Sequence, residues 1–449
     1  MAGASEPDPV STKQQRIAEL AKRAPQMGFT SLNHHLDIPW MIGAYLRTRR
    51  DGAPGVDGQT GDDYGKSLLD NLASLLERAK SGAYRAPPVR RVHIPKGTGS
   101  GETRPLGIPT LEDKVLQRAV VMALEPIYEQ DFLPCSFGFR PGRSAHMALQ
   151  ALWDQVMALG GCWLLDVDLR KFFDTLGHRH LRALLRQRVR DGVLLRLIDK
   201  WLKAGVLEDG IVSYPEAGSP QGGVISPMLS NVYLHYVLDE WFEREVKPRL
   251  KGRAFLVRYA DDFVMGFACE EDARRVLAVL PKRLGKYGLT IHPDKTRLVP
   301  FVRPGTSAGS GAGLGVPSPG SFDFLGFRHY WSRSKQGRWV VKRQTAGSRF
   351  RRAVTKIAEW CRLNRHLPIG EQYQVLSQKL RGHYAYYGGV IGNIRSQSRF
   401  RYEVQLLWRK WLGRRRRRGQ LTWSWFNRLQ QRLRLPWPRA WVLPCAASP

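Results

Sequence analysis

The chain has 449 residues, with 71 Lys and Arg against 39 Asp and Glu, so its formal net charge is +32. A hydrophobic content of 43% is typical of a folded protein of two or three domains and excludes a disordered chain. The charge indicates a polyanionic partner, nucleic acid first and a membrane surface second. No apolar run approaches the roughly 18 residues of a membrane-spanning helix, and the N-terminus lacks the apolar core of a signal peptide. We therefore expect a protein of the cytoplasm that does not enter a membrane.

Helical and strand-like patterns alternate along the chain. In order, they predict helix at 11–50 and 67–82, strands at 89–95 and 104–109 around a Gly-rich tip, helix at 111–130, strand at 161–176, helices at 178–189, 193–205 and from 226, a hairpin at 255–268, helix at 271–288, strands at 289–301 and 321–334, and helix beyond about 344. Residues 303–321 are rich in Gly, Ser and Pro, which favours a flexible loop. The five cysteines are widely spaced without a CxxC pair, which argues against a disulfide framework and a structural zinc site.

The positive charge is concentrated near the C-terminus. Residues 331–449 contain 27 Lys and Arg but three Asp and Glu, together with nine of the fourteen tryptophans. Aromatics at helical spacing are typical of a core, so the pattern predicts a small helical bundle with one cationic surface. Such a surface binds phosphate backbones with little base specificity, although a charge run can also be a solvated face. The strongest cationic segment is the run Arg414, Arg415, Arg416, Arg417 and Arg418.

The stretch RYADDFVMG places Asp261 and Asp262 side by side between two strand-like arms. Adjacent acids often form a solvated turn, but aromatic and β-branched flanks predict the tip of a packed β-hairpin here. Two carboxylates this close repel each other unless a cation neutralises them, and Mg²⁺ prefers hard oxygen ligands. The pair therefore predicts a metal site and requires a further carboxylate from elsewhere.

The run LLDVDLRKFFD offers that carboxylate. Strand alternation places Asp166 and Asp168 on one face, so either could meet the hairpin, and Asp174 is a weaker candidate. Acids from two such strands could hold two Mg²⁺ ions, which activate a 3′-hydroxyl and stabilise a leaving pyrophosphate in nucleotidyl transfer. Simple pairing of these acids with the many arginines stays an alternative.

The YADD stretch and its neighbours resemble the reverse transcriptases encoded by group II introns. Seven blocks resemble the family's motifs and follow in its order: RPLGIPTLEDKVLQRAV, SFGFRPGRSAHMAL, DVDLRKFFDTLGHRHL, GSPQGGVISPMLSNVYL, RYADDFVMGF, GLTIHPDKT and FDFLGF. A later stretch, LRGHYAYYGGVIGNIRSQSRF, is similar to the family's maturase or thumb region. The resemblance spans about residues 50–440.

The resemblance assigns roles to individual residues. It selects Asp168 over Asp166 as the third metal-binding acid beside Asp261 and Asp262, and adds the carbonyl of Leu169 as a ligand. Two ions are implied, and Mn²⁺ can substitute for Mg²⁺. Phe173 matches the aromatic that crowds a ribose 2′-hydroxyl, with a core Phe beside Phe172 as the alternative.

Further assignments concern the nucleotide and the primer. Lys96 and Arg104 would bind the triphosphate as a point charge and a bidentate fork. Lys295 could protonate pyrophosphate, or it is a plain surface lysine. In the glycine-rich loop, whose backbone can approach a ligand closely, Gln221 and Gly222 would lie against the incoming nucleotide. The primer grip would be Phe324, Leu325 and Gly326.

The implied fold is α+β, a right-hand polymerase whose fingers and palm, with an antiparallel palm sheet, precede an all-α basic thumb or maturase domain. We expect a helical extension at 1–50, fingers and palm at 51–342 and the thumb at 343–449. The implied function is RNA-directed DNA synthesis together with intron RNA binding for splicing and retrotransposition. The implied partners are intron and template RNA, a DNA primer or target, and deoxynucleoside triphosphates, in the cytoplasm or nucleoid of a bacterium. The protein would be a monomer or homodimer.

Two other functions stay open. The chain could be a domesticated reverse transcriptase in phage defence or DNA repair, or an RNA-binding splicing factor with little polymerase activity. The intact site residues argue against the second. No Cys-pair or His-Asn-His pattern follows the maturase-like region, so we expect no endonuclease domain.

Overall fold

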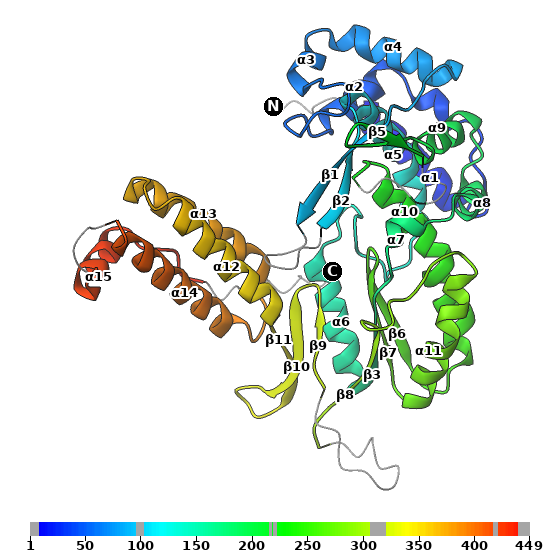
Figure 1. The fold of residues 1–449 in the computed structure, drawn as a ribbon. Helices are drawn as coiled ribbons and strands as arrows, with labels where there is room; N and C mark the ends of the chain where they lie inside the picture. Colours follow the sequence, from blue (N-terminus) through cyan, green and yellow to red (C-terminus); the bar gives the residue numbers. More distant parts are fainter. Residues whose placement is uncertain are drawn as a thin grey trace, which may run out of the picture. The chain divides into compact units, whose positions relative to one another are not determined.

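The structure is a computed structural model that describes residues 9–95, 103–214, 218, 222–305, 320–415 and 421–438 (Figure 1). Its chain divides into two compact units. The first unit contains the described residues up to 155 and residues 163–298, and the second contains residues 156–162 and the described residues from 299 onward. Within the described part, every helix is too short or too polar to cross a lipid bilayer.

Helices make up most of the first unit. They are α1 (Pro9–Arg23), η1 (Leu32–His35), α2 (Ile38–Leu46), α3 (Gly61–Gly65), α4 (Leu68–Ser81), α5 (Leu111–Asp131), α7 (Phe172–Thr175), α8 (His178–Arg188), α9 (Gly192–Leu202), α10 (Ser226–Leu234), η2 (His235–Asp239), η3 (Trp241–Val246), η4 (Lys247–Arg249) and α11 (Glu270–Gly285). The π-helices η2 and η3 continue α10 directly, and α6 (Ala145–Leu159) runs from the first unit into the second.

One sheet of this first unit has the order β2-β1-β4-β5. Its strands are β1 (Val89–Pro95), β2 (Thr103–Ile108), β4 (Val206–Glu208) and β5 (Ile211–Ser213). They pair antiparallel except for β1 and β4, which are parallel. A second sheet has the order β6-β7-β3-β8 and consists of β3 (Gly161–Val167), β6 (Ala254–Tyr259), β7 (Asp262–Phe267) and β8 (Arg297–Val302). In it, β7 pairs antiparallel with both β6 and β3.

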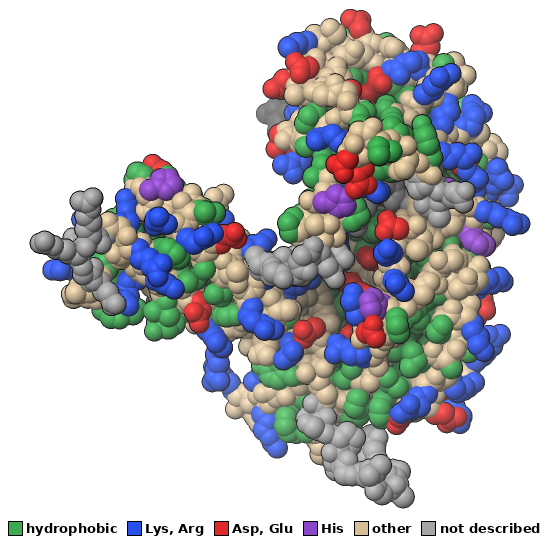
Figure 2. All heavy atoms as spheres, viewed as in Figure 1, with side chains coloured by type: hydrophobic (Ala, Val, Ile, Leu, Met, Phe, Trp, Pro, Cys, Tyr) green, Lys and Arg blue, Asp and Glu red, His purple; other side chains and the backbone are tan. Residues whose placement is uncertain are grey.

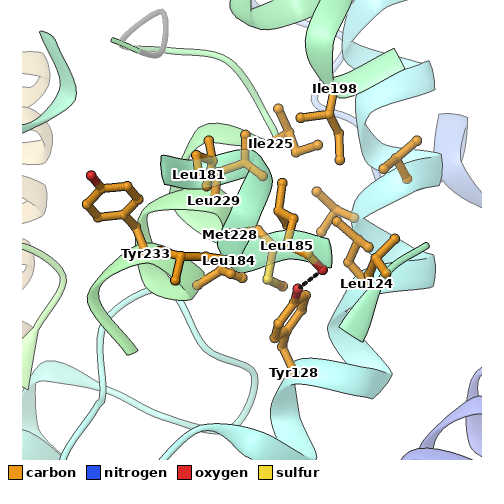
Figure 3. Close-up of a cluster of buried hydrophobic side chains, with 14 of the residues drawn as sticks. Leu124, Tyr128, Leu181, Leu184, Leu185, Ile198, Ile225, Met228, Leu229 and Tyr233 are labelled. Carbon is orange, nitrogen blue, oxygen red and sulfur yellow. Dashed lines mark hydrogen bonds between the residues drawn. The ribbon is translucent and has the colours of Figure 1, made fainter. Parts of the chain in front are cut away.

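The core of the first unit gathers around α5. The side chains of Leu116, Val120, Ala123 and Leu124, which lie on one face of this helix, are fully buried. Figure 3 shows side chains of α5, α8, α9 and α10 packed together, with the Tyr128 hydroxyl directed at the carbonyl of Leu185. Burial of this kind contributes about 25 cal/mol per Å² of apolar area. The same buried cluster includes Leu165, Leu256 and Phe263 of the second sheet.

The second unit combines a sheet with helices. Its three-stranded antiparallel sheet has the order β11-β10-β9, made of β9 (Phe322–Phe324), β10 (Phe327–Arg333) and β11 (Trp339–Thr345). The helices are α12 (Gly347–Leu363), α13 (Ile369–Tyr387), α14 (Ile394–Gly413) and α15 (Trp423–Arg432). They share a core that contains Trp408 and Phe426, which confirms the bundle predicted from tryptophan spacing.

Two predicted strands are shorter than expected. The strand predicted at 161–176 ends at Val167 and is followed by α7, because Lys171 adopts a left-handed conformation with φ 48°. The strand predicted at 289–301 is regular from Arg297 only, since the backbone turns at His292, whose carbonyl accepts hydrogen bonds from the N–H groups of Lys295 and Thr296. The predicted domain boundaries at 50 and 342 stay a prediction.

Candidate active site

The two adjacent acids lie at the tip of the predicted hairpin. Tyr259 is paired with Asp262 across β6 and β7, which leaves Ala260 and Asp261 as a two-residue turn. Ala260 has φ 58°, a left-handed conformation that turns of this length usually give to glycine. Asp261 is half-buried and Asp262, the first residue of β7, is exposed. The hairpin prediction is therefore confirmed, and the two carboxylates have different environments.

A buried arginine anchors the backbone of this hairpin tip. Arg258 has no exposed surface, and its Nε and Nη2 donate to the two carboxylate oxygens of Asp239 at 2.8 and 2.6 Å. Its Nη1 donates to Asn231 Oδ1 at 2.9 Å and to the carbonyl of Ala260 at 3.1 Å. One side chain thus connects the turn beside Asp261 to α10 and η2. A buried charge requires such full pairing, because an unpaired one is very costly.

A glycine lets a second segment reach the tip. The carbonyl of Arg258 accepts from Phe137 N–H at 2.9 Å, and Asn231 Nδ2 donates to the carbonyl of Gly138 at 2.7 Å. A Cβ at Gly138 would lie 2.2 Å from the backbone nitrogen of Ala260. Because the atoms nearest this Cβ belong to the backbone of Tyr259 and Ala260, only glycine allows the two segments to approach so closely.

The third acid enters from the end of β3. Val167 is paired with Phe263 of the antiparallel strand β7. The next residue along the chain, Asp168, therefore follows the strand at the end where Asp262 begins β7. The backbone carbonyl of Asp168 accepts from His292 N–H at 2.8 Å, which fixes the chain just beyond the strand. Lys295 Nζ lies 3.0 Å from Asp168 Oδ2 and is 61% exposed. The structure thus brings Lys295 to one of the predicted metal ligands.

The neighbouring acid has a different partner. Asp166 is paired with Val264 in the sheet, and its Oδ2 accepts from Arg297 Nη2 at 3.1 Å. Leu169, the other residue predicted as a ligand, has a buried side chain and forms an isolated β-bridge with Ile291.

The electrostatics of the three acids suit a cation. Burial raises the pKa of the Asp261 carboxyl, the nearby Asp168 carboxylate raises it further, and Arg104 and Arg258 lower it. Asp168 and Asp261 therefore repel each other, and a divalent cation with oxygen preference would relieve this repulsion. As the side chains stand, no group of three acid, His or Cys residues within the described segments is arranged to hold a metal. The fit rests on donor chemistry and on the backbone positions of Asp168, Asp261 and Asp262.

The predicted nucleotide-binding residues come from β2, α7 and the glycine-rich loop. Arg104 is exposed on β2, opposite Ile94, and is close enough to Asp261 to affect its pKa. A Cβ at Gly222, where φ is 118°, would lie 2.3 Å from the carbonyl oxygen of Gly107 in β2. Lys96 and Gln221 lie outside the described residues.

The other end of this loop contacts α7. Gly218 N–H donates to the carbonyl of Leu176 at 2.9 Å, and a Cβ at Gly218 would lie 2.9 Å from the carbonyl oxygen of Phe173. The Phe173 ring is partly buried, whereas that of Phe172, at an edge-to-face centroid distance of 5.4 Å, is 3% exposed. Gly218 of this loop therefore contacts α7, which carries Phe173, and Gly222 contacts β2, which carries Arg104.

The predicted primer grip lies in the second unit, between β9 and β10. Leu325 and Gly326 both have positive φ, 49° and 80°. The carbonyl of Leu325 accepts from the Tyr386 hydroxyl at 2.8 Å, and that of Gly326 accepts from Ala346 N–H at 2.9 Å. Phe324 is buried and paired with Phe327. The turn is therefore fixed by hydrogen bonds to its backbone.

The arginine run begins at the end of α14. The Arg414 guanidinium lies 4.8 Å from the centre of the Trp411 ring, and Arg415 donates to the carbonyls of Leu367 and His366 at 3.0 and 3.2 Å. Arg416, Arg417 and Arg418 lie outside the described residues, as does most of the predicted 303–321 loop. Figure 2 shows Lys and Arg side chains spread over the visible surface of each unit.

Comparison with known proteins identifies the family. The model of the family described as "Reverse transcriptase (RNA-dependent DNA polymerase)" matches residues 94–329. The chain belongs to the reverse transcriptase family. Membership implies a right-hand polymerase fold, which agrees with the mixed α/β architecture.

Similar proteins narrow the relationship. The chain is 34% identical to Protein YkfC of Escherichia coli over 374 residues, 74% of this chain and 91% of that protein. It is 35% identical to the group II intron-encoded protein LtrA of Lactococcus lactis over 248 residues, 53% of this chain and 40% of LtrA. It is 30% identical to nuclear intron maturase 2 of Arabidopsis thaliana over 234 residues, 43% of this chain and 30% of that protein. The resemblance inferred from the motifs is thus confirmed.

Sequence reasoning missed the residues that anchor the backbone next to the acids. Arg258, Asp239 and Gly138 lie within the motif blocks or next to them, yet none was singled out. One signal was available: an arginine inside the apolar run FLVRYA is rarely buried without a partner acid. Which acid serves could not be deduced, because Asp239 lies on another element.

Proposed function

We propose that this chain is an RNA-directed DNA polymerase that copies RNA into cDNA by two-metal nucleotidyl transfer. The observation that carries the proposal is the convergence of Asp168, at the end of β3, with Asp261 and Asp262 at the hairpin tip. The Asp168 and Asp261 carboxylates interact, and Asp261 is partly withdrawn from water. Membership of the reverse transcriptase family supports this reaction class.

Three carboxylates and one carbonyl would hold the metal. Asp168, Asp261 and Asp262, with the carbonyl of Leu169, would bind two Mg²⁺ ions, for which Mn²⁺ can substitute. When bound, the ions supply activation of the 3′-hydroxyl and charge stabilisation at the leaving pyrophosphate. Arg258 and Gly138 hold the backbone of the tip in place for this role.

The remaining site residues would bind the deoxynucleoside triphosphate. Arg104 and Lys96 would bind its phosphates, since a guanidinium fork and an ammonium suit phosphate oxygens. Gln221 and Gly222 would lie against its base and sugar. Phe173 would occupy the space of a 2′-hydroxyl. Lys295, near Asp168, would donate a proton to the leaving pyrophosphate.

Nucleic acid would be held by other parts of the chain. Phe324, Leu325 and Gly326 would act as the primer grip. The Arg414–Arg418 run, next to Trp411, would bind intron RNA and so assist splicing and retrotransposition. In this proposal residues 51–342 provide fingers and palm, and residues 343–449 provide the thumb. Similarity to LtrA and to an intron maturase supports the RNA role.

Primer extension by the purified full chain tests the proposal. A DNA primer annealed to an RNA template should be extended with Mg²⁺ or Mn²⁺ and not after chelation. Asp261→Asn and Asp262→Asn should lose extension but still bind the primed template. Asp70→Asn, an exposed acid on α4, is the matched control and should extend like wild type. Extension at the wild-type rate by either tip variant would refute the assignment of the metal ligands.

A further inference from the structure

Phe139 presents an aromatic ring to solvent from a strained backbone position. It has φ 56°, which is rare for a bulky side chain, and it is 56% exposed. Neither feature stabilises the folded protein. Strain of this kind persists where surrounding contacts enforce it, and it concentrates at functional sites.

The contacts that enforce the strain lie on both sides of Phe139. Before it, Gly138 is pressed against the Ala260 backbone, and its carbonyl accepts a hydrogen bond from Asn231. After it, the buried Arg140 donates to Glu129 at 2.9 Å and to the carbonyl of Ser136 at 2.9 Å. Phe139 cannot turn its ring inward without breaking this network.

The ring has a defined neighbour. Its centroid lies 6.5 Å from that of Tyr259, at an interplanar angle of 38°. Tyr259 is paired with Asp262 across the hairpin, and the turn that touches Gly138 continues into Asp261. An exposed aromatic surface therefore lies beside the acids that are proposed to act at a primer 3′-hydroxyl. Exposed aromatic faces stack nucleobases irrespective of sequence.

We propose that Phe139, together with Tyr259, forms a stacking platform for the base of the primer's 3′-terminal nucleotide. This inference rests on the proposed polymerase function. It gives the strained position a role: the ring holds the terminal base while the neighbouring acids act on the attached sugar. The net charge of +32 supports binding of the strand by supplying attraction to its phosphates.

Equilibrium binding of a fluorescent DNA primer on an RNA template tests the platform. Two primers are compared, one with an intact 3′-terminal base and one with an abasic 3′-terminal sugar. Phe139→Gly removes the ring and tolerates the positive φ, whereas Phe139→Trp keeps a stacking face. Phe139→Gly should weaken binding of the intact primer about ten- to hundredfold and leave the abasic primer nearly unaffected. Phe139→Trp should bind like wild type.

Four results would overturn the inference. Equal weakening of both primers, or no weakening, would show that the ring does not contact that base. If the affinity lost in Phe139→Gly depended on whether the template base, and not the primer base, was present, the ring would be assigned to the template strand. A large drop in the melting temperature of Phe139→Gly would show that the ring packs against protein. If wild-type protein neither binds nor extends the intact primer, the proposed function itself fails, which is a distinct outcome.

Discussion

The Arg258 guanidinium and the Asp239 carboxylate form a two-pronged ion pair in which neither side chain has any exposed surface. Arg258 also donates to the carbonyl of Ala260, so the pair anchors the turn that leads into Asp261. Its role is to position the acids, because neither Arg258 nor Asp239 is proposed to touch a substrate.

Breaking this pair should cost considerable stability. We expect Arg258→Met and Asp239→Leu each to lower the free energy of unfolding by about 3–5 kcal/mol, because each leaves a buried charge unpaired. Chemical denaturation measures the loss. The double variant should recover much of the stability without recovering DNA synthesis. Arg244→Met, which removes the exposed partner of the partly buried Glu240, is the control and should change stability by about 1 kcal/mol or less. Single variants as stable as this control would contradict the prediction.

Adding one methyl group at Gly138 should disturb the hairpin tip. Because the new Cβ would lie 2.2 Å from Ala260 N, the backbone must shift. We expect Gly138→Ala to lose stability by about 1–3 kcal/mol and primer extension by more than the stability loss explains. Gly285→Ala, at the end of α11 with open space around it, should be neutral or slightly stabilising. Wild-type extension by Gly138→Ala would show that the close approach is not needed.

Two adjacent phenylalanines should respond differently to truncation. Phe173→Ala should raise incorporation of ribonucleotides relative to deoxyribonucleotides, because the partly buried ring is proposed to fill the space of a 2′-hydroxyl. Phe172→Ala should instead destabilise the protein by about 3–5 kcal/mol, because that ring is in the core. Competition between the two nucleotide types in primer extension measures the ratio. An unchanged ratio with lower stability for Phe173→Ala would assign Phe173 to the core.

Neutralising Arg414 to Arg418 together should weaken intron RNA binding. The slope of log K against log salt should shrink by roughly 0.7–0.9 for each RNA phosphate that the variant no longer neutralises. Extension of a short annealed primer at low salt should change much less. Neutralising four exposed cations of the α11 region, Arg274, Arg275, Lys282 and Lys286, is the control and should affect the slope less. If the five-arginine variant kept its affinity for intron RNA but lost polymerase activity, the arginine run would belong to the primer-template channel.

A buried acid should make stability depend on pH. Burial raises the pKa of Asp113 to about 7 from 3.8, with a smaller contribution from Asp57, while a hydrogen bond from Trp201 lowers it. The folded state therefore holds the proton that the unfolded state releases above pH 4. Stability from this group is greatest below pH 4 and falls as pH rises to about 7.

Asp113→Asn isolates this effect, because the amide cannot ionise. Relative to wild type, the variant should gain stability as pH rises from 4 to 8, by up to about 4 kcal/mol. Unfolding free energies at several pH values measure the gain, with Asp70→Asn as a surface control. A constant difference between variant and wild type would show that Asp113 does not titrate in this range.

The hairpin could be predicted because its strand-forming residues flank the acids on both sides. The end of β3 could not, since the apolar residues after Asp168 suit a strand as well as a short helix, and the left-handed Lys171 decides between them. Likewise the pairing of Lys295 with Asp168 depends on the turn at His292. The acids themselves were predicted, whereas the contacts that hold them depend on tertiary structure.

The π-helical turns after α10 determine the angular position of Asp239. Two α-helical turns span about 7.2 residues, so eight steps from Asn231 along a regular α-helix would leave Asp239 rotated by about 80°. A π turn takes in about one more residue than an α turn, and η2 covers His235–Asp239. The widened helix brings both residues to one face, where both bind Arg258. A change that converted η2 into regular α-helical turns without removing a residue would therefore rotate the counter-ion away from the arginine, while leaving every side chain of the hairpin unchanged.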